Sequence, residues 1–415
     1  MLKILSQNII IYGATNGIKS LVPFLMLPIL TIHLSVEDFG ILSLVEVVIL
    51  FLAPIVSLNI ASSINVEYFK LEKKEFRKYM TNAFLLSFIS FLFISFIFII
   101  FSKQISNMLD TTNTIVLWLP LFALLRVSTQ VVLSIFQVSG EPKKFAIFSI
   151  GQTLLDFSLS YIFVVFYQYG YVGRLEGIYI AFFVFSILSV YILYKRDFFS
   201  LSTLFYSRDI LSFGIPLIPH AIGGTIMAMS DRFFISYFYN NEYVGYYTAS
   251  YQVSALMLLV GMSVNQAWTP LFFKMLKDKV EIKKILNLII IVSIFFLFCM
   301  LVIGLLRDFI FDVLVDEKFF IAKEYFYWLL LGFFFQSLYF LATNFLFYFK
   351  KTKLLASITF FGAILNIILN YIFIKYFGVI GVAYATAVTW FIYLVFVSVQ
   401  SIKTYKNSYR NDYDK

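Results

Sequence analysis

Charged side chains inside long apolar segments are the residues of this chain best suited to chemistry. Lys19 lies in the segment GATNGIKSLVPFLMLPIL, and Glu46, Arg126 and Asp156 lie in three other apolar segments. A charged side chain at the centre of a bilayer costs about 3 kcal/mol, so such residues usually face protein or water rather than lipid. Because Lys19 and Arg126 are cations, the interior that they line is expected to handle an anionic ligand.

The elements that must position these charges are membrane helices. The chain has 415 residues, of which 61% are hydrophobic and 13% are charged, whereas globular domains carry about 25% charged residues. Apolar runs of about 20 residues recur along it, each long enough to span about 30 Å of hydrocarbon as a helix. The sequence therefore predicts an all-α integral membrane protein.

Several chemistries are disfavoured by the sequence. A single cysteine, Cys299, excludes an intramolecular disulfide and a multi-cysteine metal site. The segment GATNGIKS is not a P-loop, because three residues separate its glycines and Ile18 precedes Lys19. The net charge of +9 is explained by cations that flank helices rather than by nucleic-acid binding. We expect no catalytic residue, no metal and no cofactor.

About twelve spans are expected, and the cations orient them. Of the 32 Lys and Arg residues, 23 fall on the side of the N-terminus, six on the opposite side and three within spans; the outer six include Arg174. By the positive-inside rule both termini are cytoplasmic. The spans are expected near residues 8–32, 40–65, 81–101, 113–138, 145–167, 177–194, 210–238, 243–265, 285–306, 325–349, 354–376 and 378–399.

An internal repeat divides the spans into two sets of six. The segment KKFAIFSIGQTLLDFSLSYIF begins at Lys143, and KLLASITFFGAILNIILNYIF begins 210 residues later, at Lys353. The first and seventh spans also correspond, each with a glycine followed by two prolines. We predict a six-helix lobe at 1–200, a second at 201–402 and a cytoplasmic tail at 403–415. An even number of helices per lobe indicates a pseudo-two-fold axis along the membrane normal, with the site between the lobes.

Three further segments carry a family resemblance: FGIP (213–216), SDRFFISYF (230–238) and YVGYYTASY (243–251). With the glycine turns before the sixth and twelfth spans, the chain resembles the multidrug/oligosaccharidyl-lipid/polysaccharide exporter superfamily, in particular its polysaccharide-biosynthesis flippases of the O-antigen (Wzx) type. The resemblance implies an outward-opening fold of two lobes that moves an undecaprenyl-pyrophosphate-linked oligosaccharide across the bacterial inner membrane. Its partners would be that lipid-linked substrate, the bilayer, and polymerase and chain-length proteins of the same pathway.

Lys19 and His220 are candidate substrate-binding residues. They lie at corresponding positions of the two lobes, 201 residues apart, and each is bracketed by glycine and proline. Two basic groups at related depths would suit a pyrophosphate, and a helix opened at these residues would hydrate them. The alternatives are that Lys19 extends to the cytoplasmic surface and that His220 is a neutral packed residue.

Arg126 and Asp156 are predicted to lie at similar depth, because they are 14 and 16 residues from Gly140 in a presumed helical hairpin. They are expected to pair with each other, which makes a structural ion pair that seals the first lobe. The alternative is that Arg126 contacts the sugar or phosphate of the substrate while Asp156 tunes it.

Three other charges allow two interpretations each. Asp231 and Arg232 are expected to form an interfacial ion pair or helix cap, and a substrate role is the alternative. Glu46 is expected about one and a half turns into the second span from the outer side. A carboxylate there suits ion coupling, but an interfacial glutamate is equally ordinary.

Two other functions are compatible with a chain of this kind. A multidrug or cation antiporter of the same superfamily would place carboxylates in its cavity, whereas this chain offers mainly Lys19 and Arg126. A membrane O-antigen polymerase or ligase has a similar size, but it resembles proteins with a large outer loop, and the longest outer loop expected here, 307–324, is modest. The flippase is therefore the leading hypothesis.

Overall fold

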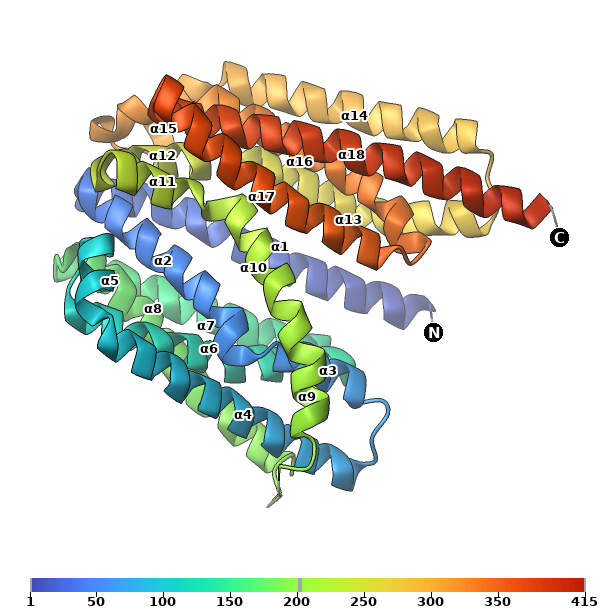
Figure 1. Ribbon diagram of the computed structural model, residues 1–415, viewed down its shortest axis with the longest axis horizontal. Helices are drawn as coiled ribbons and strands as arrows, with labels where there is room; N and C mark the ends of the chain where they lie inside the picture. Colours follow the sequence, from blue (N-terminus) through green and yellow to red (C-terminus); the bar gives the residue numbers. More distant parts are fainter. Residues whose placement is uncertain (1, 201–203, 414–415) are drawn as a thin grey trace. The chain divides into compact units, whose positions relative to one another are not determined.

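The structure is a computed structural model that describes residues 2–200 and 204–413, with the backbone alone described at 2–10, 220, 352 and 407–413. Every regular element in these ranges is helical (Figure 1). Twelve helical stretches within them are long and apolar enough to cross a membrane. The predicted all-α membrane fold and its span number are confirmed. A helix suits hydrocarbon because it satisfies its own backbone hydrogen bonds.

The contacts divide the chain into two compact units, Met1–Thr225 and Ile226–Lys415. The elements of the first unit are α1 (Leu2–His33), α2 (Val36–Ser57), α3 (Ile60–Glu67), α4 (Lys73–Ile100), α5 (Ser102–Leu109), α6 (Asn113–Val138), α7 (Pro142–Tyr161), the π-helix η1 (Ile162–Phe166), α8 (Gly170–Lys195), α9 (Ser207–Gly214), the 3-10 helix η2 (Ile215–Leu217) and most of α10 (Ile218–Met229).

The second unit contains the end of α10 and the remaining elements. These are α11 (Asp231–Phe238), α12 (Asn241–Ser254), α13 (Leu256–Lys277), α14 (Ile282–Leu305), α15 (Arg307–Leu314), the 3-10 helix η3 (Glu317–Ala322), α16 (Lys323–Tyr348), α17 (Thr352–Phe377) and α18 (Val379–Tyr413).

Local sequence signals explain where several helices begin. The hydroxyl of Ser35 accepts a hydrogen bond from the Asp38 backbone at the start of α2, and Thr112 caps α6 in the same way. Pro142 occupies the first position of α7, where its missing N–H would have no helical partner.

The boundary between the units falls inside the seventh span, after Thr225, because the start of this span packs on the first unit. Asn59 donates a hydrogen bond to the carbonyl of Gly214 at 3.3 Å, and the Tyr206 hydroxyl donates to Glu75 at 2.6 Å. A side chain on Gly214 would collide with the carbonyl of Leu58. The boundary at 200/201 that the repeat suggests remains a prediction about the repeat.

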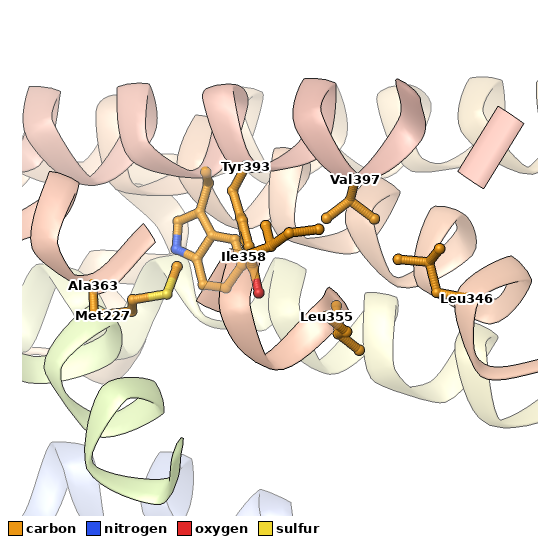
Figure 2. Close-up of a cluster of buried hydrophobic side chains, with 8 residues drawn as sticks. Met227, Leu346, Leu355, Ile358, Ala363, Tyr393 and Val397 are labelled. Carbon is orange, nitrogen blue, oxygen red and sulfur yellow. The ribbon is translucent and has the colours of Figure 1, made fainter. Parts of the chain in front are cut away.

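In the second unit, α16 and α18 are the most buried spans, and α17 packs against them. Figure 2 shows side chains from α10, α16, α17 and α18 meeting in one apolar cluster: Met227, Leu346, Leu355, Ile358, Ala363, Trp390, Tyr393 and Val397. A Cβ on Gly362 would lie 3.3 Å from the Met227 sulfur. By contrast, only 11% of the hydropathic window of α14 is buried, as expected of a helix that faces lipid.

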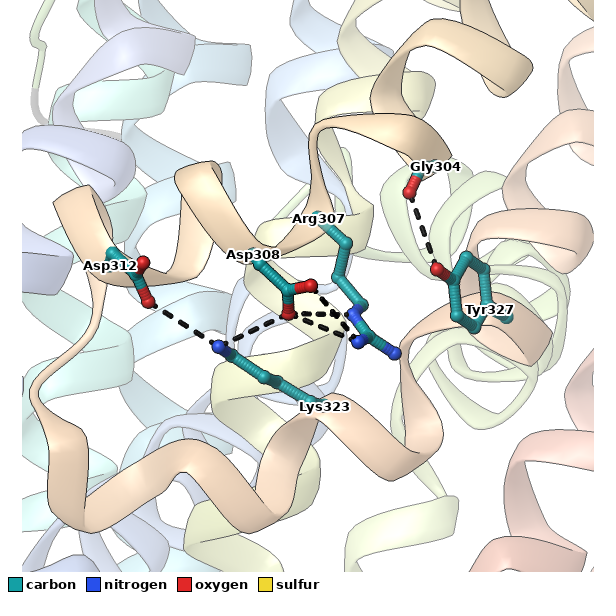
Figure 3. Close-up of polar contacts among 6 residues, drawn as sticks. All are labelled: Gly304, Arg307, Asp308, Asp312, Lys323 and Tyr327. Carbon is teal, nitrogen blue, oxygen red and sulfur yellow. Dashed lines mark hydrogen bonds and ion pairs between the residues drawn. The ribbon is translucent and has the colours of Figure 1, made fainter.

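A cluster of ion pairs stabilises the connection between α14 and α16 (Figure 3). Lys323 Nζ lies 3.2 Å from Asp308 and 3.4 Å from Asp312, both on α15, and 3.9 Å from the centre of the Phe320 ring. A hydrogen bond from Lys323, together with one from Arg307, outweighs the opposing effect of burial and holds the pKa of Asp308 below its ordinary value. These ion pairs hold the short amphipathic helix α15 against the start of α16.

Candidate functional site

A cavity of about 350 Å³ lies within the first unit and is lined by residues of five helices. It brings together four of the charged residues that the sequence singled out, from α1, α2, α6 and α7, and adds α8. The residues that line it are Lys19, Val22, Pro23, Glu46, Ile49, Leu50, Phe122, Arg126, Gln152, Thr153, Asp156, Arg174, Leu175, Ile178, Tyr179 and Phe182.

Lys19 lies on α1, half-buried, one turn before Pro23. Because proline has no N–H, Pro23 removes the hydrogen bond that the Lys19 carbonyl would accept in an uninterrupted helix. The helix itself continues through Pro23 to His33. The expected local opening of the helix at this point is therefore wrong, and Lys19 reaches the cavity from a continuous helix.

Lys19 and Arg126 lie close enough to repel each other. The guanidinium carbon of Arg126 is 5.6 Å from the centre of the Phe122 ring and 5.0 Å from that of Phe182. A cation near aromatic faces is held by the ring quadrupoles, which are weaker partners than a carboxylate. The arrangement keeps two like charges together at the cavity wall, where an anion between them would relieve the repulsion.

Two carboxylates moderate this positive charge. Glu46 and Asp156 are close enough to stabilise the charge of Arg126 electrostatically. Glu46 lies midway along α2, since this helix begins at Val36, four residues before the expected start of the span. Its expected position near the outer end is therefore wrong, and it belongs to the cavity.

The expected ion pair of Arg126 with Asp156 is also wrong. Asp156 pairs instead with Arg174 on α8, at 2.5 Å between Oδ1 and Nη1, and the Ser160 hydroxyl lies 2.6 Å from the same nitrogen. Arg126 has no ion pair among the described residues. Arg174, which we had expected in an outer connection, lies on the second turn of α8, because that helix begins at Gly170 rather than near Gly177.

Close packing of α7 and α8 explains the pairing. A side chain on Gly177 would collide with the backbone and hydroxyl of Ser160, and one on Gly173 would press against Phe163. Glycine at these positions lets the two helices approach. Arg174 and Asp156 are thereby brought within hydrogen-bond distance in a part of the unit where both side chains are largely buried.

Three buried polar atoms of cavity residues have no hydrogen-bond partner among the described residues. They are Gln152 Nε2, Arg174 Nε and the Tyr179 hydroxyl. Each can donate a hydrogen bond, and a buried donor without a partner costs about 1–3 kcal/mol. Water or a ligand with acceptor atoms in the cavity would satisfy these donors.

The cavity therefore has the chemistry of an anion site. Three cations face two carboxylates, which leaves a net charge of +1, and the Asp156–Arg174 pair accounts for one charge of each sign. Lys19, Arg126 and the three donors remain for a ligand that carries several acceptor oxygens. Phosphate oxygens and sugar hydroxyls both fit such donors.

In the second unit, Asp231 and Arg232 are buried, with 0% and 3% of their surface exposed. Asp231 accepts hydrogen bonds from the Tyr247 hydroxyl and from Thr386. The Arg232 guanidinium lies 4.6 Å from the centre of the Tyr251 ring. Asp231 is the first residue of α11, and Ser230 occupies the cap position before it. The predicted interfacial position of the pair stays a prediction.

Next to this pair, three side chains form a buried polar cluster. Asn366 accepts from the Ser230 hydroxyl at 2.9 Å and from Asn370 at 3.1 Å. With the 210-residue offset of the repeat, Asn366 and Asn370 correspond to Asp156 and Ser160 of the first unit. Each unit therefore has a polar cluster on the same repeated helix.

The sequence did not identify several residues of the cavity. Arg174, Gln152, Tyr179 and Phe182 were not singled out. Arg174 follows Gly170 and Gly173. A sixth span that starts at Gly170 instead of Gly177 is two turns longer and includes Arg174. The side chain of His220 lies outside the described part of the structure, so its predicted role in substrate binding stays a prediction.

Comparison with sequence families gives two matches. The family model described as "Polysaccharide biosynthesis protein" matches residues 5–276, and the MatE model matches residues 216–372. An Lsg locus protein of Haemophilus influenzae is 24% identical over 392 residues, which cover 90% of this chain and 94% of that protein. An uncharacterized membrane protein of the same organism is 24% identical over 385 residues, or 87% and 90% of the two chains.

Solved structures share the fold. A multidrug resistance MATE family transporter of the MOP superfamily, in an inward-facing conformation, superposes with a TM-score of 0.76 at 16% identity, over 93% of this chain and 95% of that one. The lipid II flippase MurJ gives a TM-score of 0.71 at 16% identity, over 97% and 93%. These two structures are a transporter and a flippase, and they confirm the resemblance to the exporter superfamily at the level of the fold.

Proposed function

Because the chain belongs to the polysaccharide biosynthesis protein family, we propose that it is a flippase for a lipid-linked oligosaccharide. Its substrate is an undecaprenyl-pyrophosphate-linked repeat unit, of O-antigen or a similar glycan, moved from the cytoplasmic to the periplasmic leaflet of the bacterial inner membrane. Both termini are cytoplasmic in this proposal. Polymerase and chain-length proteins act on the product.

The observation that carries the proposal is the pair of like charges in the cavity of the first unit. Lys19 and Arg126 repel each other, and three buried donors near them lack partners. A pyrophosphate supplies negative charge and several acceptor oxygens on one group. It would offset the repulsion and complete these hydrogen bonds, while sugar hydroxyls bind the remaining polar groups.

The carboxylates give the cavity a second property. Asp156 already neutralises Arg174, and Glu46 attracts Arg126. A site that held the pyrophosphate too tightly would not release it on the other side. We propose that Glu46 weakens the hold of Arg126 on the substrate, which makes Glu46 a release or ion-coupling residue.

The test is substitution of Lys19. Lys19→Ala should abolish surface polysaccharide in a complementation assay at normal protein abundance, and Lys19→Arg should retain part of it, because the charge persists. Lys103→Ala, which removes an exposed lysine from α5 of the same unit, is the matched control. Equal polysaccharide levels in the Lys19→Ala strain and the control would return Lys19 to a surface-directed role.

A binding measurement separates recognition from folding. A short prenyl diphosphate should stabilise the purified wild-type protein against heat, and the matching prenyl alcohol should not. Loss of one charge-assisted contact costs about 1.5–3 kcal/mol, so Lys19→Ala should weaken diphosphate binding about ten- to a hundredfold. Identical binding of the diphosphate and the alcohol would argue against an anion site.

A cation antiporter is the second candidate, because Glu46, Asp156 and aromatic rings do line the cavity. An organic cation prefers carboxylates and aromatic faces. In this cavity Arg126 already lies over the rings of Phe122 and Phe182. If the antiporter proposal is correct, expression of the chain should raise resistance to cationic dyes, and Glu46→Gln should abolish that resistance.

A further inference from the structure

A second cavity, of about 630 Å³, lies in the first unit away from the candidate site. It is formed where α3 ends, α4 begins, α7 begins and α8 ends, so it lies at one end of these spans. By the distribution of Lys and Arg this is the predicted cytoplasmic end. Its lining residues are Tyr68, Leu71, Lys73, Phe76, Glu141, Lys144, Arg196 and Phe198.

The lining is cationic and aromatic. Three cations, Lys73, Lys144 and Arg196, face one carboxylate, Glu141. In the segments 67–78, 141–144 and 195–197 together, nine cations stand against five carboxylates, a net charge of +4. The surrounding charge therefore reinforces that of the cavity.

The ion pairs neutralise part of this positive charge, and the three cations and one carboxylate of the lining leave a net charge of +2. Glu141 contacts Arg196 at 2.5 Å and Lys144 at 3.2 Å. Burial raises the pKa of Glu141, but hydrogen bonds from Arg196 and Lys144 outweigh burial and hold that pKa below its ordinary value. One carboxylate thus orients two cations. Lys73 reaches Asp197 at 3.9 Å, and its side chain is 71% exposed.

Arg196 is the fixed element of the cavity. Its guanidinium lies 5.1 Å from the centre of the Phe136 ring, and its side chain is 21% exposed. Lys144, by contrast, is 60% exposed. A partly buried arginine with two exposed lysines in the same cavity provides a planar fork for a phosphate group and two additional point charges.

Apolar surface continues from this cavity along α7 and α8. Ile147 lies one turn after Lys144 and is 75% exposed, and Tyr194, which precedes Arg196 by two residues, is 74% exposed. Tyr191, Ile187 and Leu154 continue this exposed surface toward the middle of the two helices. A headgroup in the cavity would leave its acyl chains beside this surface.

We propose that this cavity binds the phosphate-bearing headgroup of an anionic membrane lipid at the cytoplasmic end of the first unit. Basic pockets between transmembrane helices on the cytoplasmic side suit such headgroups, and basic residues near the surface attract anionic lipids. The three cations bind the phosphate, and the exposed faces of α7 and α8 take the acyl chains. The proposal is independent of the substrate of the candidate site.

The test measures lipids retained by the purified full-length protein. Native mass spectrometry would count phosphatidylglycerol and phosphatidylcholine molecules bound from mixed micelles of equal composition. The variant Lys73→Gln/Lys144→Gln leaves the Glu141–Arg196 pair intact. Its matched control, Lys283→Gln/Lys284→Gln, removes two exposed lysines from the same predicted side of the second unit.

We expect the wild type to retain phosphatidylglycerol over phosphatidylcholine, and the double variant to bind phosphatidylglycerol about 25-fold more weakly, about fivefold for each lysine lost. The control should bind as the wild type does. Equal retention of the two lipids, or equal losses in the variant and the control, would overturn the proposal. Displacement of phosphatidylglycerol by millimolar inorganic phosphate would show that the cavity binds a free anion, and it would overturn the proposal of a lipid ligand.

Discussion

Asp156 and Arg174 should be energetically coupled in the first unit. Removing one member of a fully buried ion pair costs about 3–5 kcal/mol, because the other charge is left in low dielectric. The two side chains are 17% and 13% exposed, so water screens part of this cost. We expect about 2–4 kcal/mol for Asp156→Ala, and somewhat less if the Ser160 hydroxyl keeps its contact with Arg174.

The double variant Asp156→Ala/Arg174→Ala should be more stable than the sum of its single variants predicts. Contacting groups show interaction energies of about 0.5–3 kcal/mol, and this pair belongs in the upper half of that range. The assay is unfolding of the purified protein by titration with a denaturing detergent, with protein abundance in cells as a second measurement.

Arg126→Ala provides the comparison, because Arg126 shares the cavity but makes no ion pair among the described residues. Its coupling to Asp156 should be smaller than that of Arg174. Strictly additive effects of Asp156 and Arg174 would refute the pairing. A larger coupling between Arg126 and Asp156 would restore the pairing that their equal distance from Gly140 suggested.

Three further outcomes follow from the packing and the charges. Gly177→Ala should destabilise the protein by about 1–3 kcal/mol in thermal unfolding, because its side chain meets the Ser160 backbone, whereas Gly223→Ala, which meets nothing within 4 Å, should not. Asp231→Ala should lower protein abundance more than Asp231→Asn, which keeps an oxygen to accept from Tyr247 and Thr386; equal abundance would show that the carboxylate oxygens do not stabilise the second unit. Reporter fusions should read cytoplasmic after Lys78, Lys284 and Lys415 and periplasmic after Asp110 and Asp316, and one robust reversal would break the predicted topology.

The sequence by itself determined the class of fold and the residues worth attention. A span needs about 20 apolar residues whatever its neighbours are, so hydropathy alone located twelve helices. The cost of a charge in hydrocarbon singled out Lys19, Glu46, Arg126 and Asp156, and the structure places all four around one cavity. Their shared location follows from the rule that such charges face an interior.

Which charge pairs with which was decided by the tertiary structure. Depth along a helix changes by 1.5 Å per residue, so placing the start of the sixth span at Gly177 instead of Gly170 shifted Arg174 by about 10 Å, out of reach of Asp156. Depth alone then made Arg126 the expected partner of Asp156. The actual pairing also needs the close approach of α7 and α8 at Gly177 and Ser160. An ion pair depends on distances of a few ångströms between helices, and hydropathy, which measures the preference of each segment for lipid, carries no information about those distances.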